Sequence, residues 1–315
     1  SLRYRPYVYA GDEDEPWFEE LHFELVWAPI FKPAQLPGSA GMAFVDPAEQ
    51  VRLANHPQIK ELARQNRGYA DGGASVNYDV TMGTPDFEIA NSAYGARAGF
   101  SLYGFDLSFS YFSGFEDFPR AEKVVVTGDA NDVQADVTLS YARIQVIGVD
   151  LTTSLDWADG IGLWTEVGIT LHDDLWTVID GTRFVGNEPG FYDTSAPGEP
   201  ANMEFINGPT IANGPIKERE RGFFVKAVVG LDYTPLPWWY INVQYLHGFI
   251  DEFGDDDLED YLVANMDFKM ANQRVTLRIA GILNFQDQSH VIFPQLIIKP
   301  FTGAEFTVGA FLYSG

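Results

Sequence analysis

The stretch Arg221-Gly222-Phe223-Phe224-Val225-Lys226-Ala227-Val228-Val229-Gly230-Leu231-Asp232-Tyr233 alternates between two kinds of side chain. Its odd positions, from Phe223 to Tyr233, are apolar, whereas its even positions carry a mixed set that includes Lys226 and Asp232. A period of two places successive side chains on opposite faces of a β-strand. One face of this strand is therefore apolar and the other is partly charged. That pattern is typical of a strand in a membrane-spanning β-barrel, with the apolar side toward lipid and the polar side toward a lumen.

Segments with the same alternation recur along the chain and are separated by turns. The clearest examples run from Leu21 to Trp27, from Ile161 to Leu171 and from Val275 to Phe285. The segment 133–155 changes phase near Ala142, which we interpret as a β-bulge within one long strand. Twelve strands are predicted, at residues 2–9, 17–28, 89–103, 106–113, 133–155, 161–172, 221–233, 239–250, 260–270, 274–285, 291–299 and 304–313.

The connections between the predicted strands alternate in length. Short turns lie at 104–105, 156–160, 234–238, 271–273 and 300–303, and the longer connections lie at 29–87, 113–132, 173–220 and 251–259, with a shorter link at 286–290. Outer-membrane barrels have short periplasmic turns and longer extracellular loops. The alternation therefore predicts an antiparallel up-and-down barrel with its short turns in the periplasm. Aromatic residues at the predicted strand ends fit belts at the two membrane interfaces. The periplasmic belt would include Trp17 and Trp157, and the outer belt Trp27, Phe112 and Phe249.

Composition narrows the class of protein further. Hydrophobic residues make up 46% of the 315, yet no run reaches the roughly 18 to 20 apolar residues of a transmembrane helix. The chain contains no cysteine, which rules out disulfides and thiolate metal sites built from it. Acidic residues number 45 against 20 basic ones, giving a net charge of −25. Nucleic acid is therefore not an expected partner, because its phosphates require a basic surface.

The direction of the predicted strands bears on the two ends of the chain. If residues 17–28 run outward, residues 2–9 begin and residues 304–313 end on the extracellular side. Barrels with short periplasmic turns are expected to begin and end in the periplasm. We therefore expect at least one further strand at each end and 14 or more in the intact barrel, with residues 1–315 forming one domain. In the first long connection, residues 46–49 and 57–68 carry helix start and stop signals, and these helices either narrow the lumen or decorate the surface.

The charged residues predicted to face the lumen divide unevenly between the two halves of the chain. The first half, through residue 172, supplies mainly acids and the second half mainly bases. Two alternatives stay open: opposed walls that set up a transverse field in a water-filled passage, or cross-strand pairs that stiffen the barrel. The candidate pore-lining residues are Glu24, Arg97, Asp106, Asp136, Glu166, Lys226, Lys269, Arg274, Arg278 and Lys299.

Two other groups of residues are candidates for a metal site or a catalytic site. The acidic run that contains Asp255, Asp256, Asp257 and Glu259 offers oxygen ligands for Ca²⁺ or Mg²⁺, but its spacing is not that of an EF-hand, and solvated surface charge is the alternative. His172, followed by two aspartates, stands at a predicted extracellular strand tip, where a hydrolase would place a water-activating group. No second acidic pair or nucleophile accompanies it. The sequence therefore predicts neither a catalytic residue nor a resident cofactor.

Several glycine-rich and aromatic segments resemble a family of Gram-negative outer-membrane proteins of unassigned function. The resemblance lies in residues 91–100, 105–119, 146–151 and 239–249 and extends over most of residues 17–313. It implies a porin-like outer-membrane β-barrel without established catalytic residues. It also implies an amino-terminal part that this chain lacks.

The sequence therefore predicts an all-β protein of the bacterial outer membrane, and not an enzyme. The expected function is a passive channel for small polar solutes or for an extended substrate, in contact with membrane lipid and lipopolysaccharide. One alternative is a structural barrel that sheathes or anchors a partner protein. A rim-located hydrolase is the remaining alternative, and association with a second copy of the chain is left open.

Overall fold

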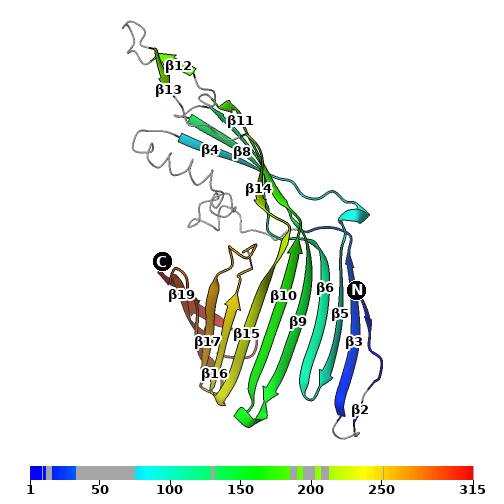
Figure 1. Cartoon of the computed structure of the whole chain (residues 1–315). Helices are drawn as coiled ribbons and strands as arrows, with labels where there is room; N and C mark the ends of the chain where they lie inside the picture. The colour runs from blue at the N-terminus through cyan, green and yellow to red at the C-terminus, as the bar shows by residue number, and fades with distance from the viewer. Residues whose placement is uncertain are drawn as a thin grey trace.

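The computed structural model describes residues 1–8, 10–11, 16–32, 75–128, 132–184, 190–193, 203–206, 213–250 and 252–314. These residues form a 14-stranded sheet, a five-stranded sheet and a two-stranded sheet (Figure 1). Within them, the helical elements are two 3-10 turns, η2 (Ile89–Asn91) and η3 (Asp156–Ala158). No helix in the described part of the chain has the length and apolarity needed to cross a membrane. The predicted all-β class is thus confirmed.

The 14-stranded sheet is named the wall. Its order is β1-β3-β5-β6-β9-β10-β15-β16-β17-β18-β19-β20, with β2 paired to β3 and β21 paired to β19. Its strands are β1 (Leu2–Tyr4), β2 (Ala10–Gly11), β3 (Pro16–Ala28), β5 (Ala93–Leu102), β6 (Phe105–Phe115), β9 (Arg143–Leu155), β10 (Ile161–His172), β15 (Gly222–Leu236), β16 (Trp239–His247), β17 (Asp260–Met270), β18 (Val275–Asn284), β19 (His290–Ile298), β20 (Phe306–Gly309) and β21 (Leu312–Ser314).

The wall is an antiparallel meander in which neighbouring strands follow one another along the chain. Each of the twelve predicted strands contributes to it, and the predicted bounds of β10 and β17 are those observed. β1 lies within the first predicted strand and β2 directly follows it, whereas the last predicted strand is divided into β20 and β21; these short strands bring the strand number to 14. In the described residues no ladder joins β1 to β20, so the wall is an open, curved sheet (Figure 1).

The register of the wall aligns the apolar side chains of neighbouring strands on one face. Phe109 stands opposite Val149, Val149 opposite Val167, and Val167 opposite Ala227. Directly opposite residues of an antiparallel pair lie on the same side of the sheet. This side is named the apolar face and the other the polar face. Large side chains exposed on the apolar face include Phe23, Leu25, Trp27, Phe109, Ile147, Val149, Ile169, Leu171, Val229, Leu231, Val243, Tyr245, Leu296 and Ile298.

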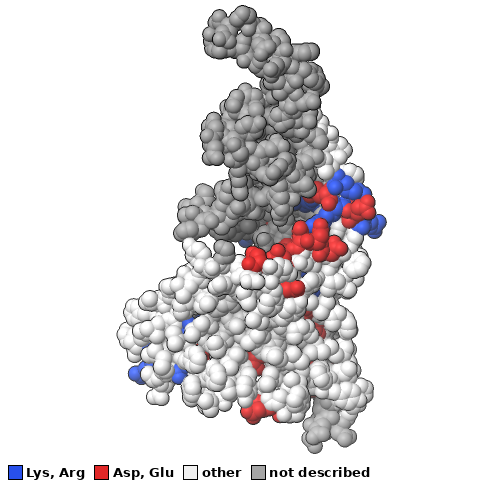
Figure 2. Space-filling model, turned by 60° about the vertical axis from the view of Figure 1, so that its left-hand side comes forward, with Lys and Arg blue, Asp and Glu red and all other residues white. Residues whose placement is uncertain are grey.

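Charge is distributed unevenly over the molecule. Figure 2 shows a broad, mostly uncharged surface over the wall, bounded above by a belt of acidic and basic side chains. Soluble monomers rarely expose a contiguous apolar patch larger than a few hundred Å². The exposed side chains of the apolar face extend across the meander from β3 to β19.

The five-stranded sheet continues from strands of the wall and is named the rim sheet. Its order is β14-β11-β7-β8-β4, with β11 parallel to β7 and β4 parallel to β8. It joins the wall at the end that we name the rim (Figure 1). The strands outside the wall are β4 (Ser75–Met82), β7 (Arg120–Gly128), β8 (Asp132–Ser140), β11 (Leu175–Phe184), β12 (Gly190–Asp193), β13 (Met203–Ile206) and β14 (Gly214–Arg219).

The rim sheet has the main buried core of the described residues on one of its faces. This core consists of Ala121, Val124, Val126, Val133, Val137, Leu139 and Ile179, with Ile216 packed against it. The wall, by contrast, leaves many of its large apolar side chains exposed. The two sheets therefore differ in how they bury apolar surface.

One strand prediction and three loop predictions are wrong. Residues 133–155 do not form one bulged strand: β8 belongs to the rim sheet and β9 to the wall, with the break at Tyr141 and Ala142. The connections 29–87, 113–132 and 173–220, predicted as loops, contain strands of the rim sheet or the two-stranded sheet. Alternation with a period of two identifies a strand but does not say which sheet it joins. The predicted helices at 46–49 and 57–68 lie outside the described residues.

The opposite end of the wall is closed by short turns, as predicted. Tyr103 and Gly104 form a two-residue hairpin in which both φ angles are positive, at 51° and 78°. Such turns match the twist of the strands that they join. Several aromatic side chains are exposed at this end, among them Trp17, Trp157 and Trp238. At the rim, Trp27 is exposed on the apolar face, but Phe112 and Phe249 do not join an apolar-face belt there. Phe112 has the parity of the polar face, and Phe249 packs on Tyr261.

Candidate functional site

The polar face of the wall carries most of the predicted pore-lining residues. Their strand parity is set by the register, in which Glu24 stands opposite Arg97 and Asp267 stands opposite Arg278. Arg274 lies in the turn after β17, and Lys299 directly follows β19. The predicted residues on the polar face of wall strands are Glu24, Arg97, Asp106, Glu166, Lys226, Lys269 and Arg278.

Asp136 is the predicted residue that the wall does not contain. It lies in β8 of the rim sheet, where its exposed carboxylate accepts a hydrogen bond of 2.9 Å from Gln134. The assignment of Asp136 to the lumen is therefore wrong. It followed from reading residues 133–155 as a single strand.

In the first half of the wall, charged side chains form a chain of contacts across strands. Arg3 pairs with Glu24 at 3.1 Å, and Arg97 pairs with Asp150 at 3.2 Å. Ser108 links the second pair, because it accepts a hydrogen bond from Arg97 at 2.8 Å and donates one to Asp150. Cross-strand pairs of this kind contribute roughly 0.2–1 kcal/mol each.

Asp150 is a polar-face residue that the sequence prediction missed. It stands directly opposite Glu166, so two carboxylates face each other on β9 and β10. The alternation of Val149 and Leu151 already assigns Asp150 to the other face. Continuing the parity past the phase change would have identified it.

In the second half of the wall, basic side chains also have acidic partners on adjacent strands. Arg278 donates two hydrogen bonds of 2.7 Å to the two oxygens of Asp267, and Lys299 pairs with Glu305 at 3.0 Å. Asp267 is buried, and a bidentate guanidinium satisfies both of its oxygens. At these positions the contacts favour the pairing alternative over two opposed walls of charge.

The segment between β16 and β17, residues 248–259, is named the rim loop; the structure describes all of it but residue 251. It is fastened to the polar face. The Lys226 ammonium donates hydrogen bonds to the carbonyl oxygens of Phe249, at 2.7 Å, and Ile250, at 3.3 Å. Phe253 is buried against Phe224, with ring centroids 4.9 Å apart. A charged and an aromatic contact thus hold the rim loop over the upper part of β15.

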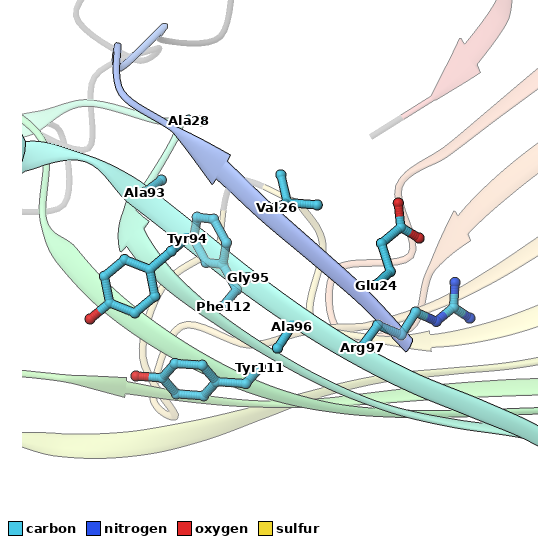
Figure 3. A pocket seen from close by; sticks show the side chains of 10 residues that line it. All are labelled: Glu24, Val26, Ala28, Ala93, Tyr94, Gly95, Ala96, Arg97, Tyr111 and Phe112. Atoms are coloured by element: carbon cyan, nitrogen blue, oxygen red, sulfur yellow. The ribbon is translucent and has the colours of Figure 1, made fainter. Parts of the chain in front are cut away.

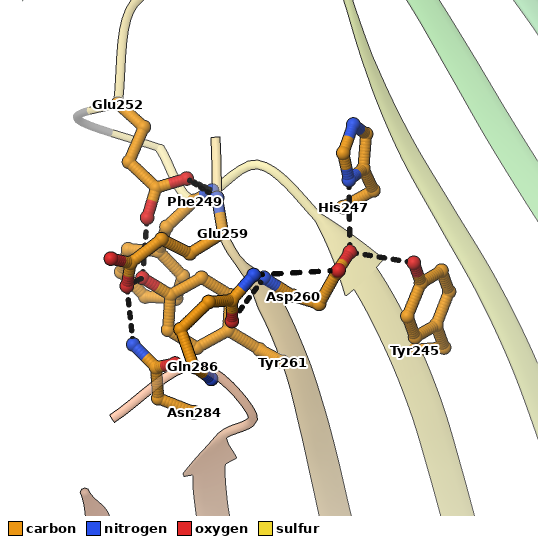
Figure 4. A network of polar contacts seen from close by, with 9 residues as sticks. All are labelled: Tyr245, His247, Phe249, Glu252, Glu259, Asp260, Tyr261, Asn284 and Gln286. Carbon is orange, nitrogen blue, oxygen red and sulfur yellow. Dashed lines mark hydrogen bonds and ion pairs between the residues drawn. The ribbon is translucent and has the colours of Figure 1, made fainter. Parts of the chain in front are cut away.

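Carboxylates inside the rim loop fix its own backbone (Figure 4). Glu252 accepts hydrogen bonds from the backbone N–H groups of Phe249, at 2.8 Å, and Glu259, at 3.0 Å, and from the Tyr261 hydroxyl. Glu259 in turn accepts from the amide of Asn284. The loop is therefore bound to both β17 and β18. Hydrogen bonds of this number within a loop stabilise it against local unfolding.

A second polar cluster lies beside the first, and the register places its residues on the apolar face. His247 Nδ1 lies 2.9 Å from Oδ1 of Asp260, and the Tyr245 hydroxyl donates to the same oxygen at 2.6 Å (Figure 4). A carboxylate oxygen only accepts, so Nδ1 of His247 carries the hydrogen and Nε2 of the uncharged ring is left as an acceptor.

His172 is not exposed at the rim, as a group that activates water there would have to be. Its side chain is buried, with its ring 5.3 Å from that of Phe253 and 6.0 Å from that of Phe224. Nδ1 lies 2.9 Å from the backbone carbonyl oxygen of Asp173. The hydrogen is again on Nδ1, because a carbonyl oxygen only accepts. The ring contacts the Asp173 backbone, and no hydrogen bond to a carboxylate is seen in the described residues.

Two carboxylates of the acidic run proposed as a cation site are paired with an arginine. Arg219 forms ion pairs with both Asp256 and Asp257. A Cβ at Gly254 would collide with the Arg219 guanidinium, and glycine, with φ of 95°, leaves that space open. A hydrogen bond from Arg219 holds the pKa of the Asp256 carboxyl below its ordinary value of 3.8. Within the described residues, no cluster of three or more His, Asp or Glu could hold a metal ion.

Two hollows of ligand size lie near the rim. One, of about 350 Å³, lies across the upper ends of β3, β5 and β6 and is lined largely by small and aromatic residues (Figure 3). The small residues Gly95 and Ala96 line it together with the rings of Tyr94, Tyr111 and Phe112. The second, of about 680 Å³, lies between β14, the top of β15 and the rim loop. Both fall within or near the size range of small-molecule sites.

No family model, curated protein or solved structure matches this chain. The resemblance to the outer-membrane family therefore stays a prediction.

Proposed function

We propose that this chain forms the wall of a transmembrane β-barrel in a bacterial outer membrane and acts there as a passive channel for small polar solutes. The observation that carries the proposal is the apolar face: a continuous set of exposed aliphatic and aromatic side chains that crosses the whole meander. Apolar surface left in water costs about 25 cal/mol per Å², so a face of this kind that crosses the whole sheet is costly in water. Contact with hydrocarbon removes that cost.

The polar face supports a water-filled passage on the other side. Its ion pairs leave the polar face charged but locally balanced, as with Arg278 and Asp267. Charged side chains are compatible with a barrel interior that contains water, and they are costly against lipid. The alternation along each strand thus separates two solvents.

The two ends of the wall support an orientation. The short turns suit the periplasmic side, and the rim, with its long connections and second sheet, suits the extracellular side. The rim loop over the polar face would narrow the mouth of the passage, since Lys226 and Phe253 hold it inward.

Planar-bilayer conductance of the purified chain tests this function. A steady ohmic current is expected, and its ion selectivity is expected to respond to the polar face. The variant Arg278→Gln leaves Asp267 without its partner and should move the reversal potential in a KCl gradient toward cations. The charge-balanced double variant with Asp267→Asn should return it. Vesicle-inserted protein that carries no current would refute the channel.

A second candidate function, a barrel that holds or anchors a partner, is favoured by one observation. The rim sheet extends strands of the wall beyond the rim, and its edge strand β4 shows exposed Val80 and Met82. An exposed strand edge can pair with a strand of another chain. Silent insertion into bilayers, together with co-purification of a stoichiometric partner, would favour this function over the channel.

A further inference from the structure

The upper part of β15 lacks a neighbouring strand on one side. Its ladder with β10 continues to the pair His172–Gly222, whereas its ladder with β16 begins only at the pair Ala227–His247. Residues 222–226 therefore extend beyond the end of β16. Their neighbour on that side is the rim loop, which Lys226 holds through the carbonyl oxygens of Phe249 and Ile250. The wall has a notch at this place.

The cleft of about 680 Å³ occupies this notch and reaches both faces of the wall. Phe223 and Val225, which line it, belong to the apolar face by their register with Leu171 and Ile169. Phe224 and Gly222 also line it and belong to the polar face. The lining of the cleft therefore includes residues of both faces.

The polar groups of the cleft are mainly acceptors. His172 and His247 both line it, and Nδ1 of each lies 2.9 Å from a protein oxygen that only accepts, so in the neutral form of either ring Nε2 is an acceptor. Gly222 leaves room beside His172, since a Cβ there would lie 3.8 Å from Nε2. His172 is 92% buried, and no described group bonds to its Nε2. A ligand that enters here would find hydrogen-bond acceptors.

The charges that line the cleft also favour a ligand that donates hydrogen bonds. The lining contains four carboxylates and one guanidinium, and three of the carboxylates, those of Glu218, Glu220 and Asp256, are paired with basic side chains. That guanidinium, of Arg219, is already paired with Asp256 and Asp257, so an anionic head group would find no available cation in the described lining. Asp255 has no hydrogen bond or ion pair in the described residues and is exposed. The complementary head group is a cation that donates hydrogen bonds.

We propose that this notch is a lateral binding site for an amphiphile with a protonated amine head and an aliphatic chain. The amine would lie on the polar side, beside Asp255 and His172, and the chain would lie along Phe223 and Val225 toward the apolar face. The membrane setting of the notch rests on the proposed function. The site gives such a molecule a path between the polar face and lipid that a barrel without the notch would not offer.

Binding of octylammonium to the full chain in nonionic detergent, measured by calorimetry against octyl sulfate, tests the site. Octylammonium should bind and octyl sulfate should not. Asp255→Asn should weaken octylammonium binding by roughly tenfold, the loss of one favourable charge contact. The matched control Asp287→Asn removes the same charge at the rim outside the cleft and should leave binding unchanged. Equal binding of both probes, or equal loss in both variants, would overturn the proposal.

Position in the notch is tested by labelling, which the absence of native cysteine makes specific. Octylammonium should protect Val225→Cys from a maleimide and leave Val229→Cys, on the same face outside the cleft, reactive. Equal reactivity at both positions would reject the site. The measurement needs neither conductance nor a bilayer, so failure of the channel and failure of the binding site give separate results.

Discussion

Placing an arginine on either face of β15 is the most direct test of the two-sided wall. Val229 is the central residue of β15 and points to the apolar face, where it stands opposite Thr165 and Tyr245. Val228 precedes it and points to the polar face, opposite Glu166 and Leu246. The variants Val229→Arg and Val228→Arg thus make the same chemical change one residue apart.

The expected difference follows from what each face touches. An arginine near the middle of a bilayer costs about 2–4 kcal/mol on the lipid side of a barrel. On the polar face, the new arginine at position 228 stands opposite Glu166, and such a cross-strand pair returns roughly 0.2–1 kcal/mol against the lost packing of the valine. If Val229, which is 42% exposed, faced water instead, its replacement would change stability by only about 0.5 kcal/mol either way.

The assay is urea unfolding of the chain in lipid vesicles, followed by tryptophan fluorescence and by the gel mobility of unheated samples. Val229→Arg should lower the free energy of unfolding by about 2–4 kcal/mol more than Val228→Arg. Equal free energies for the two variants, or a chain that stays soluble and folded without detergent or lipid, would refute the assignment of the apolar face to hydrocarbon.

Three further outcomes are expected. Gly230→Ala should destabilise the wall by about 1–3 kcal/mol in the same assay, because its Cβ would collide with the Trp164 indole; an unchanged midpoint would show that the indole moves freely. Asp267→Asn and Arg278→Gln should each cost about 1–3 kcal/mol, and the double variant less than their sum; strict additivity would contradict the pair. The pKa of Asp256 is lowered in the folded state, so the stability that its ion pair with Arg219 contributes is complete above pH 3.8 and is lost as pH falls through the folded-state pKa. Backbone hydrogen exchange in the rim loop should rise over that pH range. An exchange rate that does not respond to this loss would contradict the role of the ion pair in holding the loop.

Much of the wall could be predicted from the sequence because its strands carry their own two-sided pattern. The bounds of β10 and β17 followed from alternation alone, as did the polar-face parity of Arg97 and Arg278. The short turn after β5 was predicted at residues 104–105, one residue from its observed position at Tyr103 and Gly104. These features depend on neighbouring residues, so a local reading identifies them.

The candidate site was harder to predict because its parts come from distant segments. Nothing in residues 113–132 or 173–220 indicates that their strands leave the wall and form a second sheet. The partner of Arg219 in the rim loop and the burial of His172 against Phe253 are likewise set by contacts between separate connections. Such contacts have no periodic signal in the sequence.

By itself, the sequence determined that strands with one apolar and one polar face would run up and down along this chain, because side-chain alternation is a property of each strand. Only the tertiary structure decided that the register joins those faces across the whole wall, that β7, β8, β11 and β14 leave it, and that β16 ends five residues short of the top of β15. The physical reason is that register and strand ends are fixed by backbone hydrogen bonds between strands, whose partners the alternation of a single strand does not specify.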